Sequence, residues 1–302
     1  MSLAAGRRVS AVIVHYLTRK ETVESAQALA ATAPETEILV VDNASGDSIE
    51  DPLRALVPSA RAIRESENRG YGAACNRGAR ETSREFLMFL NSDAVVQPGA
   101  VDALVAALDR DSHAAVAGPR LENPDGSLQT SILRLPTLGR VFFESAGLAY
   151  LTGGRLHGHS ATSEDHARAH EVEAVKGAAL LVRRTAFEEV GGFDESFFLY
   201  AEESDLAARL RRCGWRILFE PRARVVHRGG ASGGDSLFGQ LNESLATYVA
   251  RHQGKLAGGA ARFVLKAGAA ARYALSLVTP GERGRIRRSK YRAALAGPPR
   301  RA

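Results

Sequence analysis

The chain has few of the residues that stabilise secreted scaffolds, because it contains only two cysteines, Cys75 and Cys213. They form neither a paired disulfide framework nor a CxxC metal site, which fits a reducing compartment. No stretch reaches the roughly 18 uninterrupted apolar residues of a membrane-spanning helix. The segment Met1 to Arg8 has no apolar run that would indicate a signal peptide. These absences predict a cytoplasmic protein.

Acidic residues are scarce near the C-terminus. The whole chain carries a formal net charge of +6, and 45% of its residues are hydrophobic, enough for a full globular core. Much of the basic excess lies at the end of the chain, in Arg283, Arg285, Arg287, Arg288, Lys290, Arg292, Arg300 and Arg301. Such a tail indicates either contact with anionic lipid or another polyanion, or a solvated segment that aids solubility.

Strand and helix patterns alternate over the first hundred residues. Short runs of apolar and β-branched residues predict strands at Val9–Tyr16, Glu37–Val41 and Phe86–Leu90. Ala-rich segments at residues 21–33 and 72–82 predict helices between them. Repeated βα units of this length predict a doubly wound α/β fold with a mostly parallel, Rossmann-like central sheet.

Polar clusters follow two of these predicted strands. Asp42-Asn43 follows one, and Asn91-Ser92-Asp93 follows another. Ligands of doubly wound sheets bind beyond the carboxyl ends of the strands, so the clusters mark a candidate site. Each cluster taken alone is more typical of an ordinary turn or helix cap than of a binding site.

The second half of the chain adds further chemistry-bearing groups. A strand-like run at 174–182 contains Lys176-Gly177, and an aromatic segment leads into the acidic cluster at 202–205. Two strands are predicted at Trp215–Phe219 and Arg224–Val226, the second followed by His227. Helical patterns then cover residues 236–252 and 260–278.

These residue types match the needs of sugar transfer from a nucleotide diphosphate. A carboxylate and an imidazole can bind a divalent cation that neutralises the departing diphosphate. A separate carboxylate must accept the proton of the attacking hydroxyl. Asp93, His227 and the 202–205 cluster supply these groups.

At this point the chain resembles glycosyltransferase family 2, and within it the bacterial rhamnosyltransferase-like branch. Five motifs carry the resemblance in the family's order over about residues 9–232. They are Val40 to Asp47, Glu67 to Gly78, Phe89-Leu90-Asn91-Ser92-Asp93, Phe197 to Leu206, and His227 to Ser232.

The resemblance implies a GT-A fold and a set of binding residues. It places Asp42 and Asn43 at the nucleoside and Asp93 and His227 on Mg²⁺ or Mn²⁺. Asn91-Ser92-Asp93 matches the family's DxD element, with Asn where the first Asp usually stands. The remaining positions that it assigns to the nucleotide sugar are Asn68, Gly70, Gly72, Asn76, Asn91, Ser92, Lys176 and Gly177.

The catalytic base falls in the segment Glu202-Glu203-Ser204-Asp205, where the family usually has Glu-Asp-x-Asp. Glu203 matches the base position, with one methylene more than the usual Asp. Neighbouring acids should raise its proton affinity, which suits a base. Glu202 and Asp205 complete the catalytic set, and Asp205 also suits the first turn of the following helix.

The resemblance further implies an inverting transferase. We expect dTDP-rhamnose as donor, with UDP or GDP sugars left open, and a glycan or polyprenyl-linked acceptor; no nucleic acid is expected as partner. The predicted transferase domain spans residues 1–232, with a nucleotide-sugar half at about 9–118 and an acceptor half at about 119–232. A helical, basic extension follows at 233–302, and it could hold the enzyme on the anionic inner face of the membrane.

Three other functions remain open from the sequence. An NAD(P)-dependent oxidoreductase would use the segment Gly70 to Cys75 in the manner of GxGxxG, but Cys75 replaces the third glycine. A sugar nucleotidyltransferase would need a Gly-rich loop after the first strand, where the sequence reads His15 to Lys20 without glycine. The third is a sugar-binding protein without catalytic activity.

Overall fold

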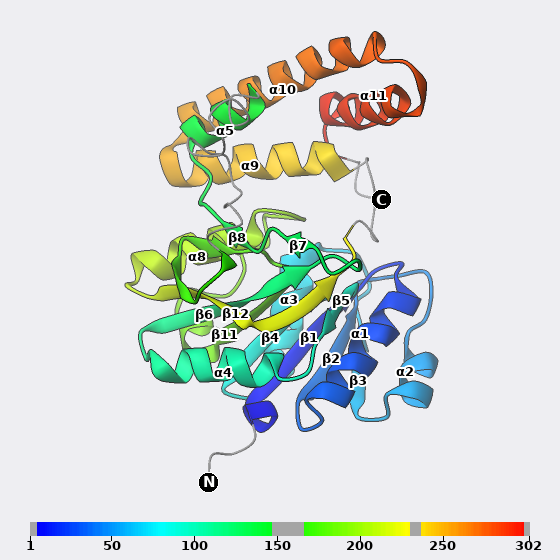
Figure 1. The fold of residues 1–302 in the computed structure, drawn as a ribbon, viewed down its shortest axis with the longest axis vertical. Helices are drawn as coiled ribbons and strands as arrows, with labels where there is room; N and C mark the ends of the chain where they lie inside the picture. Colours follow the sequence, from blue (N-terminus) through cyan, green and yellow to red (C-terminus); the bar gives the residue numbers. More distant parts are fainter. Residues whose placement is uncertain (1–4, 147–165, 230–236, 299–302) are drawn as a thin grey trace. The chain divides into compact units, whose positions relative to one another are not determined.

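The computed structural model of the protein describes residues 5–146, 166–229 and 237–298 (Figure 1). The chain divides into two compact units. The first comprises residues 1–133, 161–198 and 202–232, and the second comprises residues 134–160, 199–201 and 233–302.

A mostly parallel sheet forms the centre of the first unit, in the strand order β3-β2-β1-β4-β11-β6-β12-β5. β7 pairs with β6 and β9 with β12, while β8 and β10 pair separately. The strand bounds are β1 Val9–His15, β2 Glu37–Asp42, β3 Ala60–Arg64, β4 Phe86–Asn91, β5 Ala94–Val96, β6 Ala114–Glu122, β7 Leu128–Gln129, β8 Ile132–Leu133, β9 His170–Val172, β10 Ala174–Val175, β11 Ala179–Arg183 and β12 Arg216–His227.

Helices cover both faces of this sheet, so the predicted doubly wound α/β fold is confirmed (Figure 1). Along β1, Ala11 and Ile13 belong to the core that includes α1 and α4, whereas Val12 faces α3. Gly78 lets α3 lie close to the sheet, because a Cβ there would be 2.4 Å from Val12 Cγ1. The helices of this unit are α1 Arg19–Thr32, α2 Glu50–Leu56, α3 Tyr71–Arg80, α4 Ala100–Arg110, α7 Arg184–Glu189 and α8 Glu202–Arg212, after the 3₁₀ turn η1 Ala5–Arg8.

Two details of the sheet differ from the expectation. β11 runs antiparallel to both β4 and β6, in the middle of the order, and β5 at its end runs antiparallel to β12. The two strands expected at Trp215–Phe219 and Arg224–Val226 form one strand, β12, whose pairing with β6 shifts register between Glu220 and Arg224. This irregularity accommodates Pro221, which cannot donate a ladder hydrogen bond.

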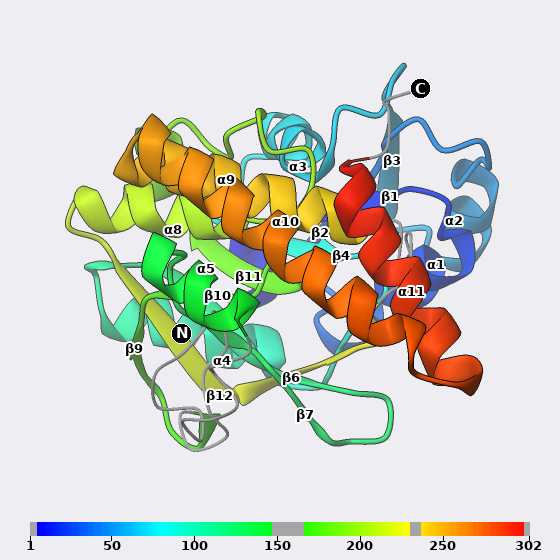
Figure 2. The same cartoon turned by 90° about the horizontal axis from the view of Figure 1, so that it is seen from above.

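The second unit is helical. It contains α5 Leu138–Ser145, α9 Phe238–Gln253, α10 Lys255–Leu277 and α11 Gly281–Ala296. α10 packs against α5, α9 and α11 (Figure 2), and it approaches α9 closely at Gly258, where a Cβ would be 2.3 Å from Ala250 Cβ. Of the helices in the described ranges, none has the length and apolarity required to cross a membrane.

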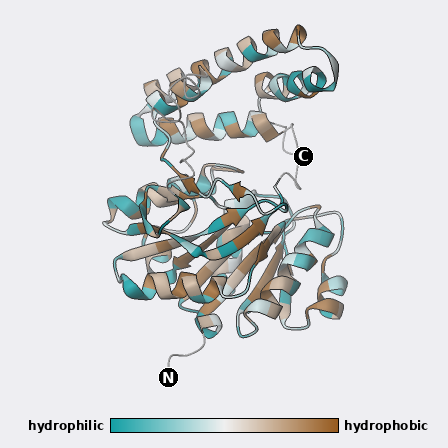
Figure 3. Ribbon diagram, viewed as in Figure 1, coloured by the Kyte–Doolittle hydropathy of each residue, from teal (hydrophilic) through white to brown (hydrophobic). Residues whose placement is uncertain are grey.

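Hydropathy is distributed differently in the two units (Figure 3). In the first unit the strands are predominantly hydrophobic and lie inside, as expected for a sheet covered on both faces. In the second unit, hydrophobic residues also occur on the outer side of α10.

Candidate active site

The predicted polar clusters lie at one edge of the sheet. His15 at the end of β1 is in register with Asp42 at the end of β2, and Val14 is in register with Asn91 at the end of β4. The chain leaves this edge through constrained turns, since Leu17 and Ala44 have φ values of 55° and 59°. Non-glycine residues in this region cost energy and gather at functional sites.

Asp42 is buried at this edge. Its Oδ1 accepts a hydrogen bond from the backbone N–H of Ser45 at 2.7 Å, and Arg64 Nε lies 3.5 Å from its Oδ2. Ser45 Oγ in turn accepts from the backbone N–H of Leu17 at 2.8 Å. These contacts tie the ends of β1, β2 and β3 into one polar pocket wall.

Asn43 connects this wall to the Gly70 loop. Its Nδ2 donates to Asn68 Oδ1 at 2.8 Å and to the Gly70 carbonyl at 3.3 Å. Asn68 Oδ1 also accepts from the backbone N–H of Gly70 at 3.0 Å. Two side-chain amides therefore fix the loop, and three of the predicted donor-binding residues are brought together.

The glycines of this loop are required by the protein's own packing. Gly70 has φ of +95°, and a Cβ there would be 2.3 Å from the Phe198 carbonyl oxygen. The backbone N–H of Tyr71 donates to that same carbonyl at 2.9 Å. A Cβ on Gly72 would meet Phe193 Cβ at 3.1 Å and Glu202 Cβ at 3.7 Å. The loop thus packs directly on the segment that leads to the acidic cluster.

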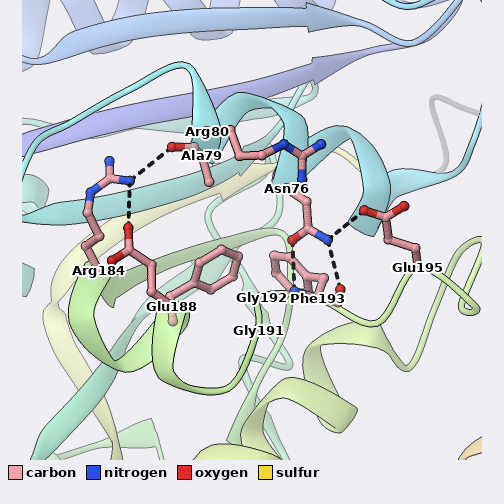
Figure 4. A pocket seen from close by; sticks show the side chains of 10 residues that line it. Asn76, Ala79, Arg80, Arg184, Glu188, Gly191, Gly192, Phe193 and Glu195 are labelled. Carbon is pink, nitrogen blue, oxygen red and sulfur yellow. Dashed lines mark hydrogen bonds and ion pairs between the residues drawn. The ribbon is translucent and has the colours of Figure 1, made fainter.

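Asn76 serves this packing as well. Its Oδ1 accepts from the backbone N–H of Phe193 at 2.9 Å, and its Nδ2 donates to the Phe193 carbonyl at 2.8 Å and to Glu195 Oε1 at 3.1 Å. It also lines a pocket of about 390 Å³ beside Arg184 and Glu188, and Asp93 and His227 are not among the residues that line it (Figure 4). The described contacts of Asn76 are thus with protein, and its donor-binding role stays a prediction.

Asp93 and His227 lie together at the ends of β4 and β12, both buried. His227 Nε2 is 3.3 Å from Asp93 Oδ1 and 3.4 Å from Asn91 Nδ2. Burial alone would raise the pKa of Asp93. The His227 ring and the backbone N–H groups of Asp93 and Gly229 outweigh it and lower that pKa, so the carboxylate is ionised.

Gln129 orients the His227 ring. Gln129 Oε1 accepts from His227 Nδ1 at 2.6 Å, while Gln129 Nε2 donates to the His227 carbonyl at 3.1 Å and to Asn123 Oδ1 at 2.9 Å. With Nδ1 bound to Gln129, Nε2 is the ring nitrogen that faces Asp93. Metal-bound histidines have this arrangement, in which the other ring nitrogen donates to a fixed oxygen.

The donor set fits a divalent cation that also binds phosphate. Two cis ligands at about 2.1 Å from Mg²⁺ lie about 3 Å apart, close to the 3.3 Å between Asp93 Oδ1 and His227 Nε2. Within the described ranges no three His, Cys, Asp or Glu side chains gather as a complete metal cage. Mg²⁺ sites commonly use one or two protein ligands and complete their shell with substrate phosphates and water. Ser92 lies beside this pair and accepts from Thr18 Oγ1 at 2.9 Å.

Lys176 lies near both the Asp93–His227 pair and the acidic cluster. Its Nζ donates to Gln129 Oε1 at 3.3 Å. Burial lowers the pKa of Lys176, against the opposing effects of the Glu203 and Asp93 carboxylates. The neighbouring Gly177 lies beside Glu203, because a Cβ on Gly177 would be in ordinary contact with Glu203 Cβ at 3.5 Å. Glu203 and Asp93 thus both lie near Lys176.

The three acids of the cluster occupy different environments at the start of α8. Glu202 is buried, and burial together with the Glu203 carboxylate raises its pKa well above the ordinary value. Asp205 is fully buried and accepts from Arg209 Nε at 2.7 Å. Glu203 is only half-buried and lies beside Lys176. Of the three, Glu203 is the only one that is not buried.

Sequence reasoning did not find three residues of this site. The β6–β7 hairpin puts the Gln129 side chain on His227. Tyr71 Oη donates to the Gly177 carbonyl at 3.4 Å. Arg64, beside Asp42, was not singled out. The Asn123–Gly126 turn was a signal for the hairpin, but no local pattern indicated what Gln129 would contact.

Comparison with known proteins agrees with this geometry. Residues 10–191, more than half of the chain, match the profile of "Glycosyl transferase family 2". The chain is 32% identical over 220 residues to the N-acetylglucosaminyl-diphospho-decaprenol L-rhamnosyltransferase of Mycobacterium tuberculosis (strain H37Rv), covering 68% of this chain and 70% of that protein. It is 38% identical over 56 residues to the rhamnosyltransferase WbbL of Escherichia coli K12, covering 18% of this chain and 21% of WbbL.

Solved structures share the fold at low sequence identity. GalNAc-T7 with UDP, GalNAc and Mn²⁺ superposes with a TM-score of 0.61 at 15% identity, covering 94% of this chain and 54% of that one. The mannosyltransferase PcManGT of Pyrobaculum calidifontis, in complex with GDP-Man and Mn²⁺, gives 0.55 at 17% identity, with coverage of 96% and 85%.

The family match argues against the oxidoreductase alternative. The position of the glycine loop does so as well, because a dinucleotide-binding glycine motif follows the first strand, whereas the Gly70 loop follows β3. The fold, the arrangement of polar residues at the strand ends and the similarity over two thirds of the chain lead to the same assignment. The protein belongs to glycosyltransferase family 2, as a GT-A-fold glycosyltransferase similar to the family's rhamnosyltransferases.

Proposed function

We propose that the enzyme transfers rhamnose from dTDP-rhamnose to a hydroxyl of a lipid-linked glycan, with inversion at the anomeric carbon. The observation that carries the proposal is the connected cluster of Asp93, His227, Gln129, Lys176 and Glu203. Similarity to an N-acetylglucosaminyl-diphospho-decaprenol L-rhamnosyltransferase supports both the sugar and the type of acceptor.

The nucleotide sugar would lie along the edge formed by β2, β1 and β4. Asp42 would accept hydrogen bonds from the nucleoside, and Asn43 would donate one to it. The loop from Asn68 to Gly72 would lie along the nucleotide. Lys176 and Gly177 would contact the sugar-diphosphate portion, where the lysine ammonium offsets phosphate charge. Register between the three strand ends supports this path.

Transfer proceeds as a single displacement. The acceptor oxygen forms a bond to the anomeric carbon while the bond from that carbon to the diphosphate oxygen breaks, and the electron pair leaves on the diphosphate. Glu203 takes the proton of the acceptor hydroxyl as this oxygen attacks. The partial exposure of Glu203 and its place beside Gly177 support this role.

Asp93 and His227 would hold Mg²⁺ or Mn²⁺, which when bound would offset the negative charge on the departing diphosphate. Asn91 and Ser92 line the same position, and Gln129 keeps the His227 ring oriented. The neutral Asn91 in place of the family's first Asp should moderate the affinity for the cation.

Glu202 and Asp205 would support the base without exchanging protons with substrate. Glu202 lies beside Glu203, and burial together with the Glu203 carboxylate raises its pKa well above the ordinary value. Asp205 fixes the first turn of α8 through Arg209.

We further propose that residues 1–232 form the transferase domain, with the nucleotide sugar bound by about 9–118 and the acceptor by about 119–232. The basic extension at 233–302 would hold the enzyme at the cytoplasmic face of the membrane, where a polyprenyl-linked acceptor is found. The exposed, unpaired thiol of Cys213 suits a reducing cytoplasm.

A donor hydrolysis screen tests the proposal. dTDP-rhamnose should be hydrolysed faster than UDP or GDP sugars, and EDTA should abolish the reaction until Mn²⁺ or Mg²⁺ is restored. NMR of the anomeric proton in the transfer product should show inverted configuration. Preference for a UDP or GDP sugar would contradict the rhamnosyl assignment, and full activity in EDTA would contradict the metal assignment.

A further inference from the structure

The outward face of α10 is apolar over almost its whole length. Leu256 and Phe263 are 93% and 74% exposed, and Val278 directly after the helix is 81% exposed. Exposed residues recur at helical spacing as Leu256, Ala260, Phe263, Ala267, Ala270 and Ala274. Leu275 and Leu277 extend this face at its C-terminal end. We call these residues, with Val278, the α10 apolar face.

Two arginines of α10 bond to its neighbours in the helical unit. Arg262 Nε donates to Glu243 Oε2 of α9 at 3.0 Å, and Arg272 Nη2 donates to the Glu144 carbonyl of α5 at 2.8 Å. A solvated helix normally has its charged residues outside and its apolar stripe inside. α10 departs from this order, because its largest exposed side chains are apolar, and extended exposed apolar surfaces of this kind mark binding faces.

The charge around this face selects the type of partner. Residues 255–302 contain twelve basic residues and a single acid, Glu282. Six of the basic residues lie on α11, which runs beside α10 within the helical unit (Figures 1 and 2). Lys255 and Lys266 are exposed on α10 itself. An apolar stripe flanked by Lys and Arg is the composition of helices that lie in the interface of anionic membranes.

We propose that the α10 apolar face inserts into the headgroup region of an anionic membrane, with α11 binding lipid phosphates beside it. The helix spans about 35 Å and does not meet the requirements for crossing a bilayer, so it lies parallel to the surface. A second copy of the chain is a poor occupant, because a twofold interface pairs a surface with itself and would bring two strongly basic regions together. The inference rests on the proposed function only in that a lipid-linked acceptor brings the enzyme to a membrane.

Vesicle flotation of the full chain tests this surface. The protein should float with phosphatidylcholine vesicles that contain phosphatidylglycerol, and high salt should weaken the binding. The double variant Leu256→Glu/Phe263→Glu should lower the partition coefficient by about tenfold or more, because two large apolar side chains no longer insert. Leu56→Glu is the matched control: Leu56 is an exposed leucine on α2, outside the proposed surface, and its variant should bind like the wild type.

A second variant pair separates the charge from the apolar contact. Arg285→Glu/Arg292→Glu should weaken binding to vesicles with phosphatidylglycerol and leave the weak binding to pure phosphatidylcholine unchanged. Thermal melts should show that all variants fold, since the altered residues are exposed or partly exposed. Hydrolysis of dTDP-rhamnose in the absence of lipid should be equal in the wild type and the Leu256→Glu/Phe263→Glu variant.

Two results would overturn the inference. One is flotation of the Leu256→Glu/Phe263→Glu variant at the wild-type level. The other is a wild-type dimer by light scattering that the same substitutions dissociate, which would assign the face to a second copy. A wild type that floats but hydrolyses no donor would contradict the proposed function and leave the membrane face standing.

Discussion

Replacing Gln129 with leucine should weaken Mn²⁺ binding while the fold stays intact. Leucine keeps most of the side-chain volume but removes the acceptor 2.6 Å from His227 Nδ1 and the donor 3.1 Å from the His227 carbonyl. His227 is buried, so its Nδ1–H loses a partner that water cannot readily replace.

The magnitude follows from two separate considerations. Leaving a buried donor without an acceptor costs about 1–3 kcal/mol. Removing an outer-shell partner of a metal-bound histidine typically lowers metal affinity by about 10- to 100-fold, or about 1.4–2.7 kcal/mol. The two ranges of free energy overlap. Both describe the loss of the hydrogen bond that holds the His227 ring in the orientation that binds the cation.

Electron paramagnetic resonance titration of Mn²⁺ in the presence of dTDP measures this affinity without relying on turnover. Gln129→Glu keeps an acceptor for Nδ1–H and should restore most of the affinity. Gln97→Leu is a suitable control, because the Gln97 amide donates to the Val95 carbonyl and not to His227. If Gln129→Leu bound Mn²⁺ as tightly as the wild type, the assignment of His227 as a ligand oriented by Gln129 would be refuted.

Four further outcomes are expected. Glu203→Gln should lower the transfer rate by about 10²- to 10⁴-fold with an unchanged melting temperature. Equal rates for Glu203→Gln and wild type would exclude this base. Asp205→Asn should instead lower the melting temperature, because the ion pair of the buried Asp205 carboxylate with Arg209 is lost. Gly70→Ala should abolish dTDP binding by calorimetry, since the new Cβ would be 2.3 Å from the Phe198 carbonyl; normal affinity would show that the loop can move. The raised pKa of Glu202 means that the folded state keeps a proton that the unfolded state loses, so its contribution to stability is complete below the unfolded pKa and falls as pH rises toward the folded pKa. Glu202→Gln should therefore flatten the decline of the melting temperature above about pH 5, and an unchanged slope would contradict the buried, protonated state.

The strands that carry the site could be predicted because their signals are local. Val9–Tyr16, Glu37–Val41 and Phe86–Leu90 differ by a residue or less at each end from β1, β2 and β4. Short β-branched runs that end at polar residues need no distant information to be recognised as strands. The direction of β11 could not be predicted in this way, because its pairing with β4 and β6 depends on chain segments far apart in sequence.

The separate roles of the three acids also required the tertiary structure. Glu202, Glu203 and Asp205 stand within four residues, and sequence alone describes them as one acidic start of a helix. Glu202 is buried against Gly72, and Asp205 accepts a hydrogen bond from Arg209. Glu203 lies beside Gly177. These differences arise from burial and ion pairing with distant segments.

By itself the sequence determined which residue types stand at the strand ends and in what order, and this was enough to identify the family. Only the tertiary structure decided that Gln129 holds His227, that Lys176 lies near both Asp93 and Glu203, and that α10 exposes its apolar side. Motif order is encoded locally along the chain, whereas solvent exposure and hydrogen-bond partners depend on which distant segments pack together.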